Sequence, residues 1–501
     1  MKHKWLSGIL AAVVVISLFG CGASDGSDGG DGGDYEQVTF AYATMNNVPT
    51  EKGLSSVQDA VNKITREKIG VEVTLKPITL SDYSQSVSRS LQGGEKIDLF
   101  QSIYDFSNCV STGMGLDITE LIDKYAPETK DVVGEEWLKA CTVDGKLYSV
   151  PVYKPTASRG YFVCRQDVLE AAGVDLSGVD SSEDLTEIFE KVKAQNPDMT
   201  MLAPLEQGRL GETLSWQGVD YLSDSDTGAY GVLIGNDMEV KNLYESDMFV
   251  KSCTLARDWY EAGYIMKDAA TTASTVSELM SSGNYFGQFT GNPSSAQDLA
   301  GQLSAIVGYP MTAVGLSEPY LSTSAINMVS MMIASNTEVP EAAMKFLNLL
   351  YTDPDVINQI IFGIEDRDYE LDENGFAVYP EGQDSTTVPY TNQMDNGIMG
   401  NAFIMHPLAG TSEQALEEGL KANQTAAVSP AMGFIFDNSS VSVQYTAVSN
   451  VKNQYLPGLL CGSVDPETEI DAFNAALYEA GLQDIIDAKQ EQLDQWLEEN
   501  R

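Results

Sequence analysis

The sequence predicts an α/β fold made of two lobes, and three observations support this prediction. Without its N-terminal leader the chain keeps about 480 residues, more than one ordinary hydrophobic core holds. Strand-like and helix-like patterns alternate over the first hundred residues, and the alternation starts again after residue 155. Such alternation is typical of mainly parallel sheets covered by helices.

Residues 1–20 have the layout of a bacterial lipoprotein signal. Two lysines precede an apolar stretch from Trp5 to Phe19, which is too short to span a bilayer. The motif Leu18-Phe19-Gly20-Cys21 places small and aliphatic residues before a cysteine whose thiol can carry a diacylglyceryl group. We expect lipidation at Cys21, and the alternative is an ordinary secretory signal.

A flexible tether is expected from residue 21 to residue 36. Residues 22–34 contain only Gly, Asp, Ser and Ala, so they cannot bury enough apolar surface to offset the entropy lost on ordering.

The first lobe should open with the order β-α-β-α-β. The expected strands are 38–43, 71–75 and 97–103, and the expected helices cover 54–64 and 83–91. Ligands of such sheets bind outside the carboxyl ends of the strands, so the loops after Ala43 and Ile103 should face the ligand crevice.

The pattern restarts after a hairpin at Asp144-Gly145 and predicts a second lobe. The further elements expected are a strand at 161–164, helices at 167–172, 185–192 and 247–264, a strand at 325–333, two helices broken at Asp353-Pro354, a hairpin at Asn374-Gly375 and a C-terminal helix with Leu493, Trp496 and Leu497 on one face.

Composition excludes several classes of function. The chain carries 73 acidic and 29 basic residues, a formal charge of -44, and this field repels nucleic acid backbones. The five cysteines other than Cys21 show no Cys-x-x-Cys spacing, so they indicate neither a disulfide framework nor a zinc site. His406 is the only histidine outside the leader, and a structural role is expected for it. No cofactor and no metal are predicted.

Several stretches resemble one known family. Residues 144–153 are similar to a Gly-Lys-x-Tyr-x-x-Pro segment, residues 257–265 to a Tyr-x-x-Gly-Tyr-Ile segment, and residues 362–369 to a Gly-Ile-Glu-x-x-x-Tyr stretch. Together with 343–353 and 396–403 they resemble the extracellular solute-binding lipoproteins of ABC importers, in the sugar-binding type and its LipO-like branch.

This resemblance implies a bilobal periplasmic-binding-protein-like fold of type II, whose two α/β lobes are joined by a hinge of several segments. Lobe 1 would hold 37–155 plus about 316–380, and lobe 2 would hold 156–315 plus about 381–501. The implied partners are one small-molecule ligand and the permease subunits of an ABC transporter. We expect a monomer held by its lipid on the outer face of the cytoplasmic membrane of a Gram-positive bacterium.

A sugar pocket needs aromatic platforms together with planar amide or carboxylate side chains. Such residues follow the first and third expected strands, namely Tyr42, Asn46, Ser102, Tyr104 and Asp105. A plain loop or cap role is the alternative for each of them.

The second lobe offers more candidates of the same kinds. They are Arg159, Tyr161, Trp216, Tyr285, Phe286, Gln288 and Asn292, with Asn401 added by the family likeness alone. The stretch 285–292 has a simpler interpretation as a strand followed by a helix cap at Asn292. Trp259 has the spacing of a core residue.

The function predicted is capture of a polar nutrient, foremost an oligosaccharide, for delivery to an ABC permease, without catalysis. A peptide or another non-sugar solute is the second hypothesis. A surface glycoside hydrolase is an alternative from another class, although no pair of carboxylates is marked for that chemistry. A purely structural surface protein is a further alternative, which the absence of sequence repeats disfavours.

Overall fold

The computed structural model describes residues 35–44, 49–205, 208–211, 216, 218–224, 229–392, 397–409, 412 and 414–500. The chain divides into two compact units, 1–35 and 36–501, and the second contains the fold. The predicted signal, the lipidation site Cys21 and the tether up to residue 34 lie outside the described residues. Within the described part, no helix is long and apolar enough to cross a membrane.

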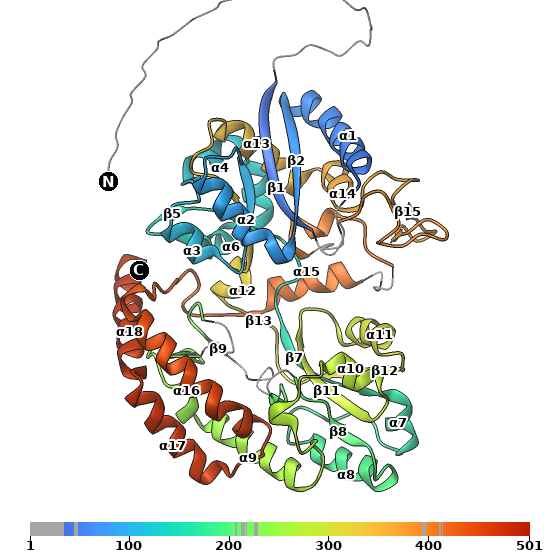
Figure 1. Ribbon diagram of the computed structural model, residues 1–501, viewed down its shortest axis with the longest axis vertical. Coiled ribbons are helices and arrows are strands. Elements are labelled where there is room, and N and C mark those ends of the chain that lie inside the picture. The colour runs from blue at the N-terminus through green and yellow to red at the C-terminus, as the bar shows by residue number, and fades with distance from the viewer. Residues whose placement is uncertain are drawn as a thin grey trace, which may run out of the picture. The chain divides into compact units, whose positions relative to one another are not determined.

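The first sheet is mixed and has five strands. In spatial order these are β2 (Val71–Thr79), β1 (Glu36–Thr44), β3 (Leu99–Ile103), β14 (Val329–Ile333) and β6 (Val150–Pro151) (Figure 1). β1 pairs in parallel with β2 and with β3, which confirms the predicted β-α-β-α-β start. β14 runs antiparallel to both β3 and β6.

Helices cover this sheet, and the blue and gold ribbons of Figure 1 show segments far apart in the sequence side by side. They are α1 (Glu51–Ile69), α2 (Leu80–Gln92), α3 (Phe106–Ser111), α4 (Thr119–Tyr125), α5 (Pro127–Val133), α6 (Glu135–Lys139), α12 (Thr323–Asn327), α13 (Pro340–Thr352) and α14 (Pro354–Phe362). Pro354 cannot continue α13, and the Asp353 carboxylate caps α14 by accepting from the N–H of Asp355 at 3.1 Å. The expected break is therefore confirmed. The strand expected at 325–333 begins later, because α12 occupies its first residues.

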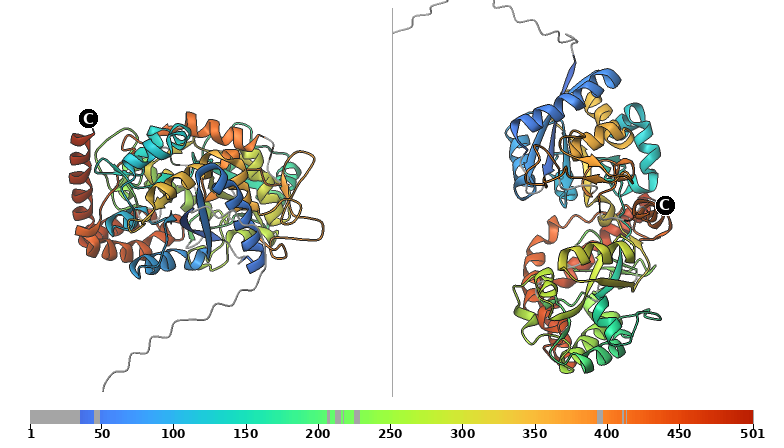
Figure 2. Two further views of the ribbon diagram at one scale, coloured as in Figure 1. Left: turned by 90° about the horizontal axis from the view of Figure 1, so that it is seen from above. Right: turned by 90° about the vertical axis from the view of Figure 1, so that its right-hand side faces the viewer.

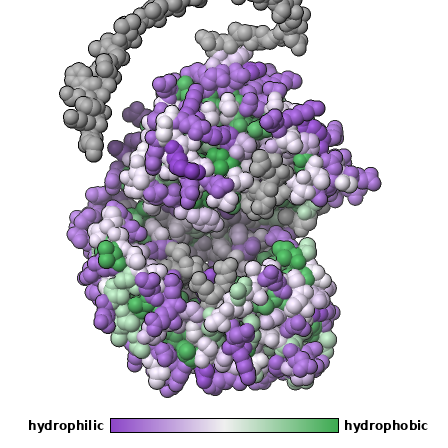
Figure 3. All heavy atoms as spheres, in the orientation of Figure 1, coloured by the Kyte–Doolittle hydropathy of each residue, from purple (hydrophilic) through white to green (hydrophobic). Residues whose placement is uncertain are grey.

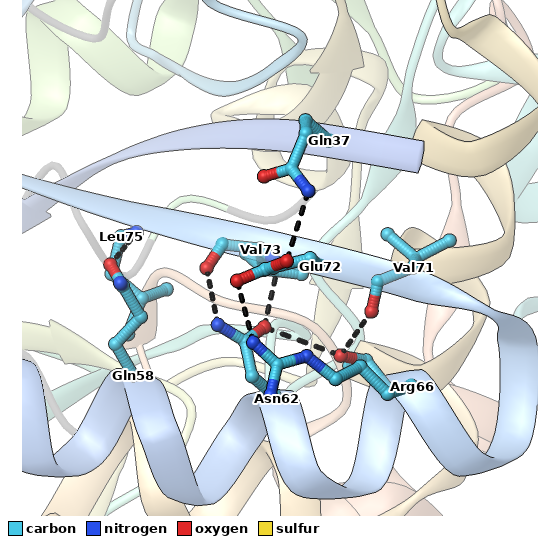
Figure 4. Close-up of polar contacts among 9 residues, drawn as sticks. Gln37, Gln58, Asn62, Arg66, Val71, Glu72, Val73 and Leu75 are labelled. Atoms are coloured by element: carbon cyan, nitrogen blue, oxygen red, sulfur yellow. Dashed lines mark hydrogen bonds and ion pairs between the residues drawn. The ribbon is translucent and has the colours of Figure 1, made fainter. Parts of the chain in front are cut away.

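The free edge of β2 is covered by polar side chains of α1 (Figure 4). Asn62 Nδ2 donates to the carbonyl of Val73 at 2.9 Å, and Asn62 Oδ1 accepts from the N–H of the same residue at 2.6 Å. The Thr65 hydroxyl donates to the Val71 carbonyl at 2.7 Å. These side chains replace a neighbouring strand, so this edge does not offer unpaired backbone groups to another chain.

The second sheet contains, in order, β12 (Met311–Gly315), β7 (Arg159–Arg165), β11 (Tyr285–Asn292) and β8 (Thr200–Leu202). β7 runs antiparallel to β11 and β12, and β8 runs parallel to β11. The carboxyl ends of β8, β11 and β12 therefore lie at the edge where β7 begins. The helices of this part are α7 (Gln166–Ala171), α8 (Leu185–Gln195), α10 (Val276–Ser281) and α11 (Ala296–Val307).

A helical layer completes the second half of the fold (Figure 2). It contains α9 (Asp247–Glu261), α16 (Ser442–Leu460), α17 (Pro466–Glu479) and α18 (Leu482–Glu499), with the short hairpin of β9 (Val219–Asp220) and β10 (Leu233–Ile234). Trp259 of α9 is fully buried, as its spacing predicted. Lys489 of α18 is also buried, and its Nζ lies 2.6 Å from the Asp224 carboxylate and 2.9 Å from the Gly231 carbonyl. Loss of either member of this ion pair would leave an unpaired buried charge.

Both predicted hairpins are present. β4 (Thr142–Val143) pairs with β5 (Lys146–Leu147), and β15 (Glu370–Leu371) pairs with β16 (Ala377–Val378). The five cysteines of the described residues are free and buried, so they pack as small hydrophobic side chains.

Three segments connect the two halves. The first follows Tyr153, the second contains β13 (Tyr320–Leu321), and the third contains β17 (Ala427–Val428), which pairs in parallel with β13. The first segment joins the second through a bridge between Ser158 and Tyr320. We propose that the first two of these segments are the crossings expected near residues 155 and 315.

The third connecting segment comes later in the chain than the crossing expected near residue 380. Tyr390, Ile398 and Met399 belong to the core of the first sheet, and the Tyr390 hydroxyl donates to the Ile360 carbonyl at 2.7 Å. Among the described residues beyond 409, α15 (Ala415–Thr425) directly precedes β17 of the third connecting segment. We therefore propose that lobe 1 extends to about residue 409.

Candidate functional site

The two sheets present loops to the hollow that crosses the face of the molecule in Figure 3. We call this hollow the crevice. From the first sheet comes the loop after β3, and from the second sheet come the ends of β11 and β12 and the start of β7. This is the edge at which α/β sheets bind ligands.

Tyr104 follows β3 at this edge and is 80% exposed. Its backbone has φ of 54°, a left-handed conformation that costs a non-glycine residue free energy. A hydrogen bond of 2.7 Å from its N–H to the Met328 carbonyl helps to hold this conformation. An aromatic ring held in the open at a strand end can stack on the apolar face of a sugar.

Asp105 comes next and is the N-cap residue of α3. Its Oδ2 accepts from Asn108 Nδ2 at 3.2 Å and from the Cys109 thiol at 3.8 Å. Burial and the nearby Asp105 charge raise the pKa of Cys109 to about 12, so the thiol stays protonated. The second oxygen of Asp105 can accept a hydrogen bond from a ligand hydroxyl.

The pairing of β7 with β11 brings together three of the predicted residues. Asn292 lies opposite Arg159, and the Arg159 guanidinium lies 5.3 Å from the centre of the Tyr161 ring. The Tyr161 hydroxyl donates to the Ser294 carbonyl at 2.6 Å, and Asn292 Oδ1 accepts from the Ser294 N–H at 2.8 Å. We call Arg159, Tyr161 and Asn292 the crevice floor, in which Tyr161 is 3% exposed and supports the Arg159 guanidinium from within the core. The next helix, α11, has its N-cap at Ser295 and not at Asn292.

Two groups near the crossings were missed from the sequence. Tyr153 packs edge-on between Trp137 and Phe403, with ring centres 5.1 and 5.0 Å away. Tyr320 lies in the second crossing, and burial together with the nearby Asp220 charge raises its pKa to about 12. In the sequence, only the position of an aromatic residue within a predicted crossing pointed to Tyr320.

Several predicted residues lie in the cores, so we no longer include them in the site. Tyr42 is fully buried, and its hydroxyl lies 2.9 Å from that of Tyr390. Ser102 is buried beside the Cys109 thiol. Tyr285 and Phe286 begin β11 and therefore lie at the end of the strand away from the crossings.

Three further predicted residues have structural roles. Gln288 is 5% exposed within β11. The Trp216 ring donates through Nε1 to the Ser252 hydroxyl at 3.0 Å and packs on Phe249. The Asn401 side chain donates to the Tyr351 carbonyl at 3.1 Å and caps the next turn by accepting from the Phe403 N–H at 3.0 Å. Asn46 lies outside the described residues.

A cavity of about 570 Å³ lies outside the crevice, between α1, α14 and residues 363–369. His406 borders it, and its ring is tilted against the rings of Phe362 and Tyr369, with centres 6.3 and 6.0 Å away. Burial lowers the pKa of His406, against the opposing effect of Glu365. No group of three or more His, Cys, Asp or Glu side chains suited to a metal occurs among the described residues.

Comparison with known families finds two matches. Residues 59–362, more than half of the chain, match the family described as bacterial extracellular solute-binding protein. Residues 430–498, which contain α16, α17 and most of α18, match a domain of unknown function, DUF3502.

Individual proteins are similar over the whole length. A carbohydrate ABC transporter substrate-binding protein of Streptococcus pneumoniae serotype 4 is 27% identical, covering 100% of this chain and 99% of the relative. The crystal structure of the N-glycan transport solute binding protein of Streptococcus pneumoniae superimposes with a TM-score of 0.79 at 24% identity, over 93% of this chain and 100% of the other. An HMO binding, ABC-transporter-associated solute binding protein of Bifidobacterium longum infantis gives a TM-score of 0.62 at 17% identity, over 92% and 99% of the two chains. The two structures share this fold.

Proposed function

Because the chain belongs to the bacterial extracellular solute-binding protein family, we propose that it captures an oligosaccharide in the crevice and delivers it to an ABC transporter. As a member of a solute-binding family it is a binding protein and not an enzyme. The observation that carries the proposal is Tyr104, an aromatic side chain held in the open, at a conformational cost, at the ligand-binding edge of the first sheet.

The proposed site combines both lobes. Tyr104 and Asp105 contribute from lobe 1, and the crevice floor of Arg159, Tyr161 and Asn292 contributes from lobe 2. An aromatic platform facing donors and acceptors suits a ligand with an apolar ring face and many hydroxyls. Contacts to both lobes would favour a closed arrangement, which permease subunits of the transporter could then recognise.

The comparisons support carbohydrate as the ligand class. The full-length relative is described as a carbohydrate transporter component, and two proteins of the same fold are described as binding N-glycans and HMO. We further propose that Cys21 carries the lipid that holds the protein on the outer face of the cytoplasmic membrane.

A thermal shift panel tests the ligand class. A true ligand stabilises the folded protein by RT ln(1 + [L]/Kd), so the melting temperature should rise with ligand concentration. Neutral oligosaccharides should give such a rise, while peptides of similar size serve as the comparison. Stabilisation by peptides and by none of the sugars would overturn the proposal, and release of shortened sugars would point to a hydrolase.

A further inference from the structure

Arg159 and Gly315 lie side by side at the crevice floor. Arg159 begins β7 directly after the first crossing, and Gly315 ends β12 directly before the second. A Cβ atom added to Gly315 would lie 1.8 Å from Arg159 Nη2 and 2.5 Å from both Cζ and Nε. The guanidinium can therefore occupy this position only because residue 315 has no side chain.

Arg159 makes fewer polar contacts than the arginine at the other end of the same strand. Arg165 donates from Nε and Nη2 to the Asp167 carboxylate at 3.0 and 2.5 Å, and from Nη1 to the Gly283 carbonyl at 3.0 Å. Among the described residues, Arg159 forms no ion pair, and its buried Nε has no hydrogen-bond partner. Buried donors are usually paired, so a guanidinium held in this way is suited to an acceptor from outside the chain.

We propose that Gly315 is a positioning residue, which leaves the space that the Arg159 guanidinium fills beside the backbone of β12, so that the guanidinium donates to an oxygen of the bound glycan. The Tyr161 ring supports the guanidinium from a second side, at 5.3 Å. Because the guanidinium is held before binding, less rotamer entropy is lost when the ligand arrives. This inference rests on the proposed function and adds one residue that controls its affinity.

A double-mutant cycle tests the proposal by calorimetry, with the best ligand of the thermal shift panel. Gly315→Ala keeps the charge of Arg159 but displaces its guanidinium, so the Kd should rise at least about tenfold. Arg159→Ala should raise the Kd to a similar extent. In the double variant the added methyl has nothing left to displace, so its Kd should equal that of Arg159→Ala.

Gly301→Ala is the matched control, because a Cβ there meets no atom within 4 Å. It should bind like the natural protein, and the melting temperature of Gly315→Ala should show that the variant is folded. An unchanged Kd of folded Gly315→Ala would overturn the positioning role. So would losses of affinity in the two single variants that are equal and add up in the double variant. If the natural protein binds no sugar of the panel, the proposed function fails instead.

Discussion

The Asn423 side chain is hydrogen-bonded to the backbone of Thr156 at the first crossing. Its Oδ1 accepts a hydrogen bond of 2.9 Å from the Thr156 N–H, and the Asn423 side chain is buried on α15. The same oxygen accepts from the Ala157 N–H at 3.0 Å, and Nδ2 donates to the Lys154 carbonyl at 2.7 Å. One amide therefore ties the first crossing to the helix that precedes the third.

Replacing Asn423 by Ala should lower the free energy of unfolding by about 2 to 4 kcal/mol, because buried backbone groups lose their partners. Chemical denaturation measures this difference. Gln424→Ala changes an exposed residue of the same helix and should have a small effect. If the two variants have equal free energies of unfolding, the hydrogen bonds from Asn423 to the first crossing do not contribute to stability.

His406 should make stability depend on pH. Burial lowers its pKa in the folded protein, so below about pH 6.5 the unfolded chain binds a proton that the folded chain resists. This part of the stability is therefore fully present at pH 7 and is lost as the pH falls from about 6.5 through the folded pKa. Urea unfolding at pH 7, 6 and 5 measures the free energy of unfolding. This free energy should fall less with decreasing pH in His406→Gln than in the natural protein. An equal fall of the free energy of unfolding in the two proteins would contradict this role of His406.

Tyr104 should contribute to ligand affinity without contributing to stability. Tyr104→Ala removes the stacking surface and should raise the Kd about tenfold, while the melting temperature changes little because the ring is exposed. Tyr104→Phe keeps the ring and should bind nearly as the natural protein does. Tyr379→Ala removes another exposed ring, outside the proposed site, as a control. Equal affinity of all three variants would remove Tyr104 from the site.

Cys21→Ala should release the protein from the membrane, because the variant lacks the thiol that would carry the acyl chains of the anchor. Fractionation of cells followed by detection of the protein measures this. Mutation of Cys461, which is buried, should leave the protein in the membrane fraction. A membrane-bound Cys21→Ala protein would refute the lipid anchor.

The sequence predicted the elements of the first sheet well, because β1, α1, β2, α2 and β3 form from consecutive residues with clear periodicity. It offers Tyr104 and Arg159 as candidates because each stands directly beside a strand end or a crossing, and both stay proposals for the site. It failed for Tyr42, since no local pattern shows that its hydroxyl meets that of Tyr390, 348 residues later.

The later position proposed for the third crossing also depends on long-range contacts. Tyr390 and Met399 follow a polar stretch that looks like a boundary, yet they return to the first core through long-range packing. Tyr320 and Asn423 were missed because their roles depend on partners in other crossings, Ser158 and Thr156. Sequence periodicity reports burial within an element, whereas these contacts depend on how distant segments meet.

The central claim is that one glycan binds in the crevice and contacts both lobes. Hydrogen–deuterium exchange of the protein, with and without a saturating sugar from the panel, tests it most directly. We predict that the sugar slows exchange in peptides that contain Tyr104 and in peptides that contain Arg159, together with the crossings. Protection confined to one lobe, or found only around the cavity beside His406, would contradict the claim.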